Sequence, residues 1–300
     1  MDMTHNKCCR HGASLRRRRR RRRKILRSII FSCSIIAVAV FVAVGSRMIT
    51  SGDGGTNKYD VEAGNNTYDN AVIENSKISE KNKIQNNQSM LDDIMNSTQY
   101  PKQLQELALK NEEALEFVYD YPAEHVKEHT IDLTEEASMD SVPLFVQWDK
   151  RWGYEKYSGN FFAASGCGPT TLSMVVVYLT HNRDASPIAV AKYSKEAGYS
   201  VDGSGSSWTL ISEGCRHYGV KAKTVALDES RMKAELDAGH PIVVNVGPGD
   251  FTDTGHFMVI TGYDDEGFSI NDPNSIEKSG KRWLFKNISS QIRAVWSMYV

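Results

Sequence analysis

A run of nineteen uncharged residues between Arg27 and Arg47 constrains the fold of this chain more than any other feature. Ile, Val, Phe and Ala dominate the run, and no Asp, Glu, Lys or Arg interrupts it. Its length is close to the roughly 20 residues that a helix needs to cross the hydrocarbon core of a bilayer. The sequence therefore predicts one transmembrane helix over residues 28–46.

A strongly basic segment precedes this run. Residues 1–27 contain twelve Lys or Arg and one acidic residue, and eight consecutive arginines run from Arg16 to Arg23. The net charge of the whole chain is only -1, so the residues after Arg27 are acidic overall. Lys and Arg beside a membrane span stay in the cytoplasm, so we expect a cytoplasmic tail and an extracytoplasmic remainder. Arginine runs also bind nucleic acid, but the neighbouring span explains this one without such a partner. A cleaved signal peptide is the rival interpretation, although its apolar region is usually only about 7 to 15 residues long.

Residues 47–140 divide by composition into two parts. Residues 47–99 are rich in Asn, Ser, Gly, Lys and Glu and poor in aromatic residues, which predicts a flexible, disordered polar linker. After Pro101, apolar residues recur at helical spacing until Tyr121 and Pro122. We therefore expect a short helical lead-in within residues 100–140.

Residues 141–300 combine helical periodicity in the first half with β-rich runs in the second. The expected helices are 169–179, 188–197, 208–218 and 231–238. The expected strands are 142–147, 241–246, 256–263, 268–271, 283–285 and 295–299. Helices followed by strands predict an α+β domain with two segregated halves.

Only two of the five cysteines, Cys167 and Cys215, fall in residues 141–300, and the spacing of the cysteines is not that of a metal site. In an oxidising compartment the two could form a disulfide. The context of Cys167 predicts otherwise, because Pro169 favours a helix start and places the thiol at a helix N-terminus, where the dipole stabilises a thiolate. Flanking glycines would leave the sulfur open to a substrate carbonyl. We interpret Cys167 as a nucleophile and Cys215, inside an expected helix, as structural.

A cysteine nucleophile needs a base and a group that orients the base. Of eight histidines, only His256 opens a hydrophobic strand, where an unsatisfied polar ring would be costly. Asp272 ends the returning strand, but hairpin register leaves it about four rungs from His256. A bulge or strong twist would have to close this gap. A turn-forming role for Asp272 remains an equal alternative on this evidence.

Four stretches together resemble the C39-like cysteine peptidases of bacteria, which have a papain-like fold. These stretches are Val142–Asp149, Ser165–Thr170, Thr254–Phe257 and Asn271–Ser275. They occur in the family's order and the resemblance covers residues 141–300. Residues 101–122 also resemble the helical lead-in of membrane-anchored members.

The resemblance implies a role for four residues. Cys167 would be the nucleophile, His256 the base and later the acid, and Asp272 the group that holds the imidazole. Gln147 would stabilise the oxyanion with the backbone N–H of Cys167. In bacteriocin-processing members a glutamine lies only a few residues before the cysteine, whereas Gln147 lies twenty residues before it. No metal or organic cofactor is required.

The predicted function is that of a membrane-anchored extracytoplasmic cysteine peptidase acting on a peptide or protein substrate. Two alternatives remain open. The same residues could hydrolyse peptide cross-links of the cell wall, or the domain could bind extended peptides without cleaving them.

Overall fold

The computed structural model describes residues 66–300, with side chains described from Lys77 onward. The basic tail and the transmembrane helix expected over residues 28–46 lie outside this range. Within it, no helix combines the length and the apolar character needed to cross a bilayer.

Most of the stretch expected as a flexible linker is helical. Helix α2 covers Asn66–Asn96 and contains no glycine or proline, the residues that most oppose a helix. Near its end, Ile94 is fully buried, and Met90 and Leu91 pack on the same apolar cluster. The expectation of a disordered linker was therefore wrong for residues 66–96, because it followed overall polarity and overlooked this apolar end.

The lead-in is a chain of short helices and not one helix. Asn111 has extended backbone angles, φ -134° and ψ 101°, which end the first helix and begin the next. Buried apolar residues of the lead-in pack against Phe161 and Ala163, just before Cys167. The elements are α3 (Lys102–Lys110), η1 (Glu112–Ala114), α4 (Leu115–Tyr119), α5 (Tyr121–Glu124) and α6 (Thr134–Ala137).

The helical half of the domain surrounds α8, most of whose residues are buried. The expected strand at 142–147 does not form, and the carbonyl groups of Val142 and Pro143 accept from the Asn271 side chain instead of from a neighbouring strand. The expected helix 208–218 is broken at Glu213. The helices are α7 (Phe162–Ser165), α8 (Cys167–Thr180), α9 (Pro187–Glu196), α10 (Thr209–Ser212) and η2 (Gly214–Tyr218). Two small hairpins join them, β1 (Lys156–Tyr157) with β2 (Asn160–Phe161), and β3 (Ser200–Val201) with β4 (Gly205–Ser206).

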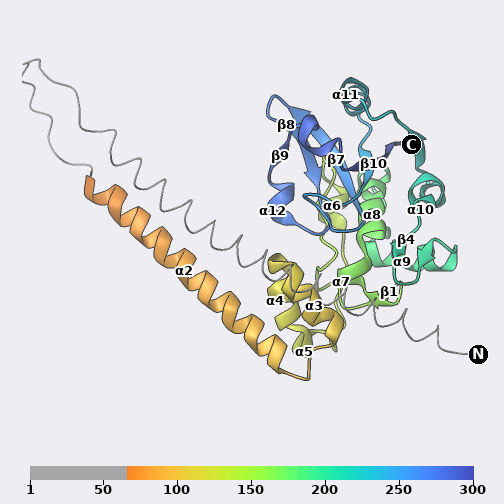
Figure 1. Cartoon of the computed structure of the whole chain (residues 1–300). Coiled ribbons are helices and arrows are strands. Elements are labelled where there is room, and N and C mark those ends of the chain that lie inside the picture. The colour runs from red at the N-terminus through yellow and green to blue at the C-terminus, as the bar shows by residue number, and fades with distance from the viewer. Residues whose placement is uncertain (1–65) are drawn as a thin grey trace, which may run out of the picture. The chain divides into compact units, whose positions relative to one another are not determined.

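The other half is a six-stranded antiparallel sheet of order β5-β10-β6-β7-β8-β9. Figure 1 shows β7, β8, β9 and β10 in one part of the domain. The sheet confirms a mixed α and β fold with a distinct sheet half. Strand β5 was not expected, and β10 lies between β5 and β6 instead of closing an edge. The strands are β5 (Lys221–Thr224), β6 (Ile242–Val246), β7 (His256–Asp264), β8 (Gly267–Asn271), β9 (Arg282–Trp283) and β10 (Ile292–Tyr299). The helices of this half are α11 (Glu229–Asp237), α12 (Ile276–Ser279) and α13 (Phe285–Ile288), the last covering part of the expected strand 283–285.

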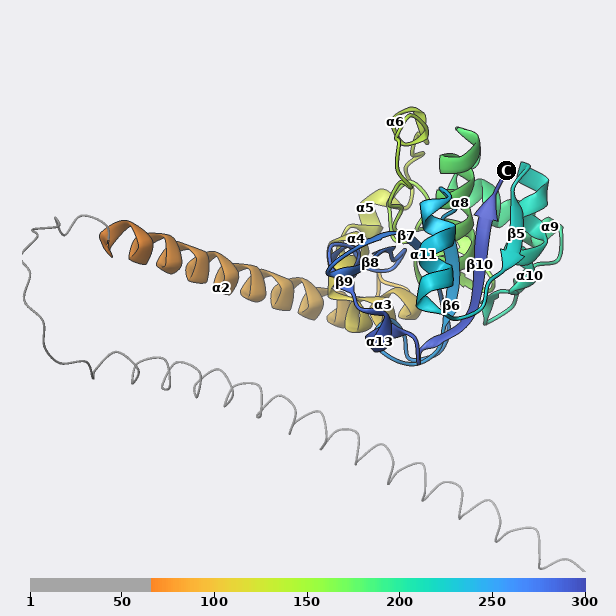
Figure 2. The same cartoon turned by 90° about the horizontal axis from the view of Figure 1, so that it is seen from above.

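Both faces of the sheet are covered. Val243 and Val259 point into the core that contains α8, whereas Val244 and Met258 point into a second core with Met232 of α11. This alternation is that of a strand, whose successive side chains point to opposite faces. All five residues of β6 are consequently buried. Figure 2 shows α8 and α11 beside these central strands.

Candidate active site

Cys167 is the first residue of α8 and is half-buried. Backbone N–H groups of Gly168 and Phe257 donate to its sulfur. The flanking glycines serve close packing. A Cβ atom at Gly166 would lie 2.6 Å from the ring of Phe162, and one at Gly168 would lie 2.5 Å from Oγ of Ser206. The predicted helix start is confirmed, and the N–H of Gly168 in its first turn interacts with the thiol.

His256 is the first residue of β7, and its ring is buried. Its Nε2 donates to Oδ1 of Asp272 over 2.6 Å, which leaves Nδ1 for the hydrogen bond with Cys167. The side chain of Asn245 on β6 donates to the backbone carbonyl of His256 over 3.2 Å and holds the start of the strand. The structure therefore brings the predicted nucleophile, base and orienting group together.

Asp272 reaches His256 because the β7–β8 ladder contains a bulge. Gly262 pairs with Ser269, but Ile260 pairs with Ile270, so Thr261 is an extra residue on β7. Strand β8 ends at Asn271, and a turn carries the next residues out of the ladder. The bulge and the turn together close the gap that hairpin register alone leaves open.

The Asp272 side chain is fully buried. Its Oδ1 also accepts from the backbone N–H of Asn274 over 2.8 Å, and its own N–H donates to Oγ of Ser279 over 2.9 Å. Its Oδ2 has no hydrogen-bond partner among the residues that the structure describes. The carboxylate is thus held by the turn while one oxygen faces the imidazole.

The electrostatics of the pair favour the charged forms of both side chains. Burial alone would raise the pKa of the Cys167 thiol. The hydrogen bond and charge of His256 oppose this effect, as do the N–H groups of Phe257 and Gly168, and together they hold the pKa of the thiol below its ordinary value. Burial would likewise lower the pKa of His256, but the charge and hydrogen bond of Asp272, with the contact to Cys167, raise it to about 10. The site therefore stabilises a thiolate beside an imidazolium.

Gln147 is buried and connects two parts of the site. Its Nε2 donates to the carbonyl of Ala163 in α7 over 2.7 Å, and its backbone N–H donates to the carbonyl of Pro273 over 2.7 Å. One amide hydrogen of Nε2 remains for another acceptor. The structure thus places Gln147 between the residues before Cys167 and the turn that holds Asp272.

Cys215 has the properties of a structural cysteine. Both Cys167 and Cys215 are free thiols, so the disulfide alternative is wrong. Cys215 is completely buried, and burial raises its pKa to about 11. Its thiol is therefore held in the unreactive protonated form at neutral pH.

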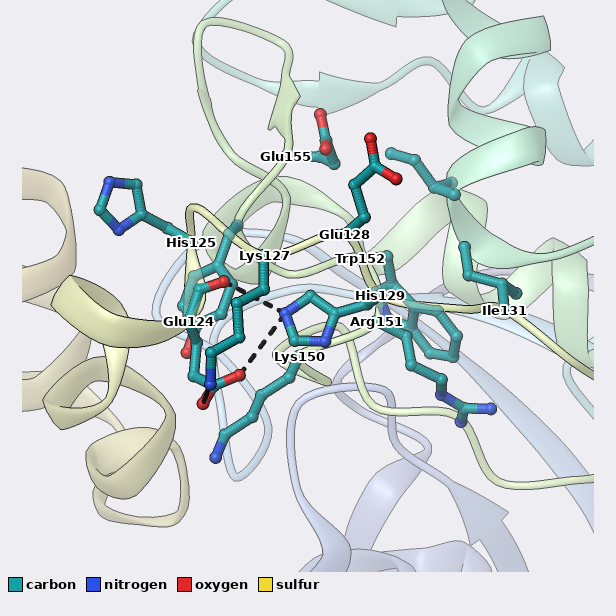
Figure 3. Close-up of a pocket in the computed structure, with 12 residues that line it drawn as sticks. Glu124, His125, Lys127, Glu128, His129, Ile131, Lys150, Arg151, Trp152 and Glu155 are labelled. Carbon is teal, nitrogen blue, oxygen red and sulfur yellow. Dashed lines mark hydrogen bonds and ion pairs between the residues drawn. The ribbon is translucent and has the colours of Figure 1, made fainter.

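A separate pocket of about 380 Å³ lies between the lead-in and residues 150–155 (Figure 3). Its charged side chains are largely paired, with Lys127 2.7 Å from Glu124 and His129 3.7 Å from the same carboxylate. None of Cys167, His256 and Asp272 lines it. The candidate active site is therefore the Cys167 centre and not this pocket.

Sequence reasoning missed two groups at this centre. The N–H of Phe257 contacts the sulfur, which its position directly after the proposed base makes possible. Tyr157, whose hydroxyl is 2.6 Å from Oγ of Ser206, lies near Cys167; burial, and to a smaller extent the charge of Cys167, raise its pKa. Tyr157 lies in an aromatic-rich segment before Cys167, which indicates packing near the site but does not predict its position beside the thiol.

A model of the Peptidase_C39-like family matches residues 139–300. One similar solved structure is the peptidase domain of Streptococcus ComA, which is described as a bi-functional ABC transporter of a quorum-sensing pathway. The two sequences are 19% identical and the TM-score is 0.38. The alignment covers 53% of this chain and 96% of that one. A C39-like peptidase from Bacillus anthracis is similar at 17% identity and a TM-score of 0.33, covering 53% of this chain and 95% of that one. No curated protein matches the chain. Because the family model covers more than half of the sequence and includes Cys167, His256 and Asp272, this chain belongs to the Peptidase_C39-like family.

Proposed function

We propose that the chain is a cysteine peptidase that hydrolyses peptide bonds through Cys167, His256 and Asp272. The observation that carries the proposal is the line of hydrogen bonds from the thiol through the imidazole to the buried carboxylate, together with the lowered pKa of Cys167 and the raised pKa of His256. A thiolate beside an imidazolium is the form that attacks a carbonyl and then protonates a leaving amine.

In the acylation step the Cys167 thiolate forms a bond to the carbonyl carbon, and the π electrons move to the oxygen. Nε2 of Gln147 and the backbone N–H of Cys167 donate to this oxyanion. When the carbonyl re-forms, the C–N bond breaks and the amine takes the proton of the His256 imidazolium. The product is a thioester on Cys167 and a neutral imidazole.

Deacylation reverses the roles. His256 accepts a proton from water as the water oxygen attacks the thioester carbon, and collapse of the intermediate breaks the C–S bond. The acid product leaves, and the thiolate and imidazolium return. In both steps Asp272 fixes the ring of His256, and its charge stabilises the imidazole whenever that ring is protonated.

Alkylation tests the nucleophile. Iodoacetamide is applied to the full-length protein at neutral pH, and the adducts are mapped by mass spectrometry. We expect Cys167 to react and Cys215 to stay unmodified, because their pKa values are shifted in opposite directions. Labelling at Cys215 with Cys167 untouched would reject the proposed nucleophile.

Activity of matched variants separates catalysis from binding. Cys167→Ala removes peptide cleavage if the chain is a peptidase, whereas Cys215→Ala retains it. Cleavage of peptide cross-links in cell-wall preparations, with no cleavage of soluble peptides, would favour the cell-wall alternative. A biological effect that survives Cys167→Ala would instead identify a binding module.

We further propose that residues 28–46 anchor the peptidase domain outside the cytoplasm. A membrane-impermeant thiol reagent on intact cells then labels Cys167, whereas Cys8 and Cys9 of the basic tail react only after the membrane is permeabilised. Labelling of Cys8 and Cys9 in intact cells would contradict this orientation.

A further inference from the structure

The lead-in contacts the turn that holds Asp272. Glu113, at the junction of α3 and α4, accepts hydrogen bonds from Oγ of Ser275 and from the backbone N–H groups of Ile276, over 2.7 Å, and Glu277, over 3.0 Å. One half-buried carboxylate therefore binds three donors in a segment more than 160 residues away in the sequence. In Figure 1, α12 lies on the same side of the domain as α4.

Asn111 makes a second contact with the same turn. Its Nδ2 donates to the carbonyl of Asn274 over 2.9 Å and lies 3.1 Å from Oδ1 of that residue. Its own Oδ1 accepts from the backbone N–H of Glu113 over 3.0 Å. Asn111 thus fixes the backbone of Glu113 with one end of its amide and binds the turn with the other.

The two contacts lead directly to the Asp272 carboxylate. Asn274, which Asn111 binds, donates its backbone N–H to Oδ1 of Asp272, the atom that accepts from His256. Ser275, which Glu113 binds, donates its N–H to the carbonyl of Asp272 over 3.2 Å. A shift of the turn would therefore displace the oxygen that stabilises the imidazolium.

We propose that Glu113 and Asn111 are positioning residues of the peptidase, which hold the Asp272 turn so that the carboxylate faces His256. The lead-in is then part of the catalytic apparatus and not only a connection to the residues before it. This inference rests on the proposed function of Cys167, His256 and Asp272. Neither residue touches the reacting atoms, so both act through Asp272.

The test uses the pKa of His256, which depends directly on its contact with Asp272. The variants Glu113→Ala and Asn111→Asp are made in the full-length protein. Asn111→Asp keeps an oxygen for the N–H of Glu113, so the local cap is retained, but it replaces the donor to Asn274 by a negatively charged oxygen that repels the carbonyl of Asn274. Glu113→Gln is the conservative variant, and Glu116→Ala is the control, because Glu116 is exposed on α4.

The His256 pKa is followed by NMR titration of ¹⁵N-histidine-labelled protein, and the rate of peptide cleavage is measured beside it. We expect Glu113→Ala and Asn111→Asp to lower this pKa by about one unit, a tenfold change in the ratio of protonated to neutral imidazole. We expect kcat to fall about 10- to 100-fold with little change in KM, because small misplacements of catalytic groups have effects of this size. In Glu113→Gln the His256 pKa and kcat should change less than in Glu113→Ala. In Glu116→Ala both should match those of the unmodified protein.

The outcomes separate the inference from the function on which it rests. An unchanged His256 pKa and kcat in folded Glu113→Ala and Asn111→Asp would overturn the positioning role, while selective alkylation of Cys167 would still support the peptidase. If Glu113→Ala does not unfold cooperatively, Asn111→Asp decides the question alone. If the unmodified protein is alkylated at Cys215 and not at Cys167, the proposed function fails first.

Discussion

Replacing Asp272 by Asn tests how the buried carboxylate controls His256. The carboxamide keeps an oxygen for Nε2 of His256 and for the N–H of Asn274, so the turn can be retained. It removes the negative charge and places an N–H₂ group where Oδ2 has no hydrogen-bond partner among the described residues. The charge-assisted hydrogen bond of 2.6 Å becomes a neutral one.

The size of the effect follows from this change. Hydrogen bonds to charged groups contribute about 1.5 to 3 kcal/mol, and one pKa unit corresponds to about 1.4 kcal/mol. We therefore expect the pKa of His256 to fall from its raised value by about 1 to 2 units in Asp272→Asn. Since imidazolium is needed to protonate the leaving amine, the alkaline limb of the pH–activity profile should move down by the same amount.

The assay is an NMR titration of ¹⁵N-histidine-labelled full-length protein, in which His256→Gln identifies the signal. In the unmodified protein one imidazole should stay protonated well above pH 6.5, with a midpoint near the raised pKa of about 10. Asp265→Asn, on the exposed β7–β8 turn, is the control and should leave that midpoint in place. A midpoint that is equally high in folded Asp272→Asn would refute the assignment of the charge as its cause.

Three further outcomes are expected from single substitutions. Gln147→Ala should lower kcat about 100- to 1000-fold with alkylation of the nucleophile retained, as loss of an oxyanion donor does, and an unchanged kcat would exclude that role. Gly168→Ala should destabilise the domain by about 1 to 3 kcal/mol, measured by chemical denaturation, because its Cβ would lie 2.5 Å from Oγ of Ser206. Glu235→Gln should lower the free energy of unfolding by about 1 to 2 kcal/mol at neutral pH. The hydrogen bonds of Glu235 to Lys223, His240 and Ser297 lower its pKa from 4.5 to about 2, so this stabilisation is full above pH 4.5 and disappears as the pH falls through 2. A difference between the two proteins that is as large at pH 2 as at neutral pH would contradict this cause.

The start of α8 could be predicted from the sequence because its determinants are local. Pro169 and the apolar residues after it specify a helix, and the helix in turn places Cys167 at its first turn. The strands with continuous apolar runs, β6 and β7, were predicted for the same reason. Short-range patterns were sufficient wherever neighbouring residues alone determine the backbone.

The contact between His256 and Asp272 could not be derived in this way. It depends on one extra residue, Thr261, in β7 and on the turn after Asn271. A bulge changes the register without a distinctive sequence, so the family resemblance was the stronger guide to Asp272. Hairpin reasoning did identify that a bulge or twist was needed.

The contribution of Glu113 was beyond any sequence pattern. The residue lies in a charged part of the lead-in, and its partners are backbone N–H groups of a distant turn. Backbone donors are present at every position except proline and leave no trace in the sequence. Only the packing of the lead-in against the domain brings the two segments together.

The position of β10 has a consequence for how the domain folds during synthesis. This strand, Ile292–Tyr299, is the last in chain order, yet it pairs with β5 on one side and β6 on the other. Until residues 292–299 have emerged, β5 and β6 each have an open edge that can pair with another chain. Strands β6, β7, β8 and β9 can pair with one another earlier, but β5 can join the sheet only through β10, so this last pairing follows synthesis of nearly the whole domain.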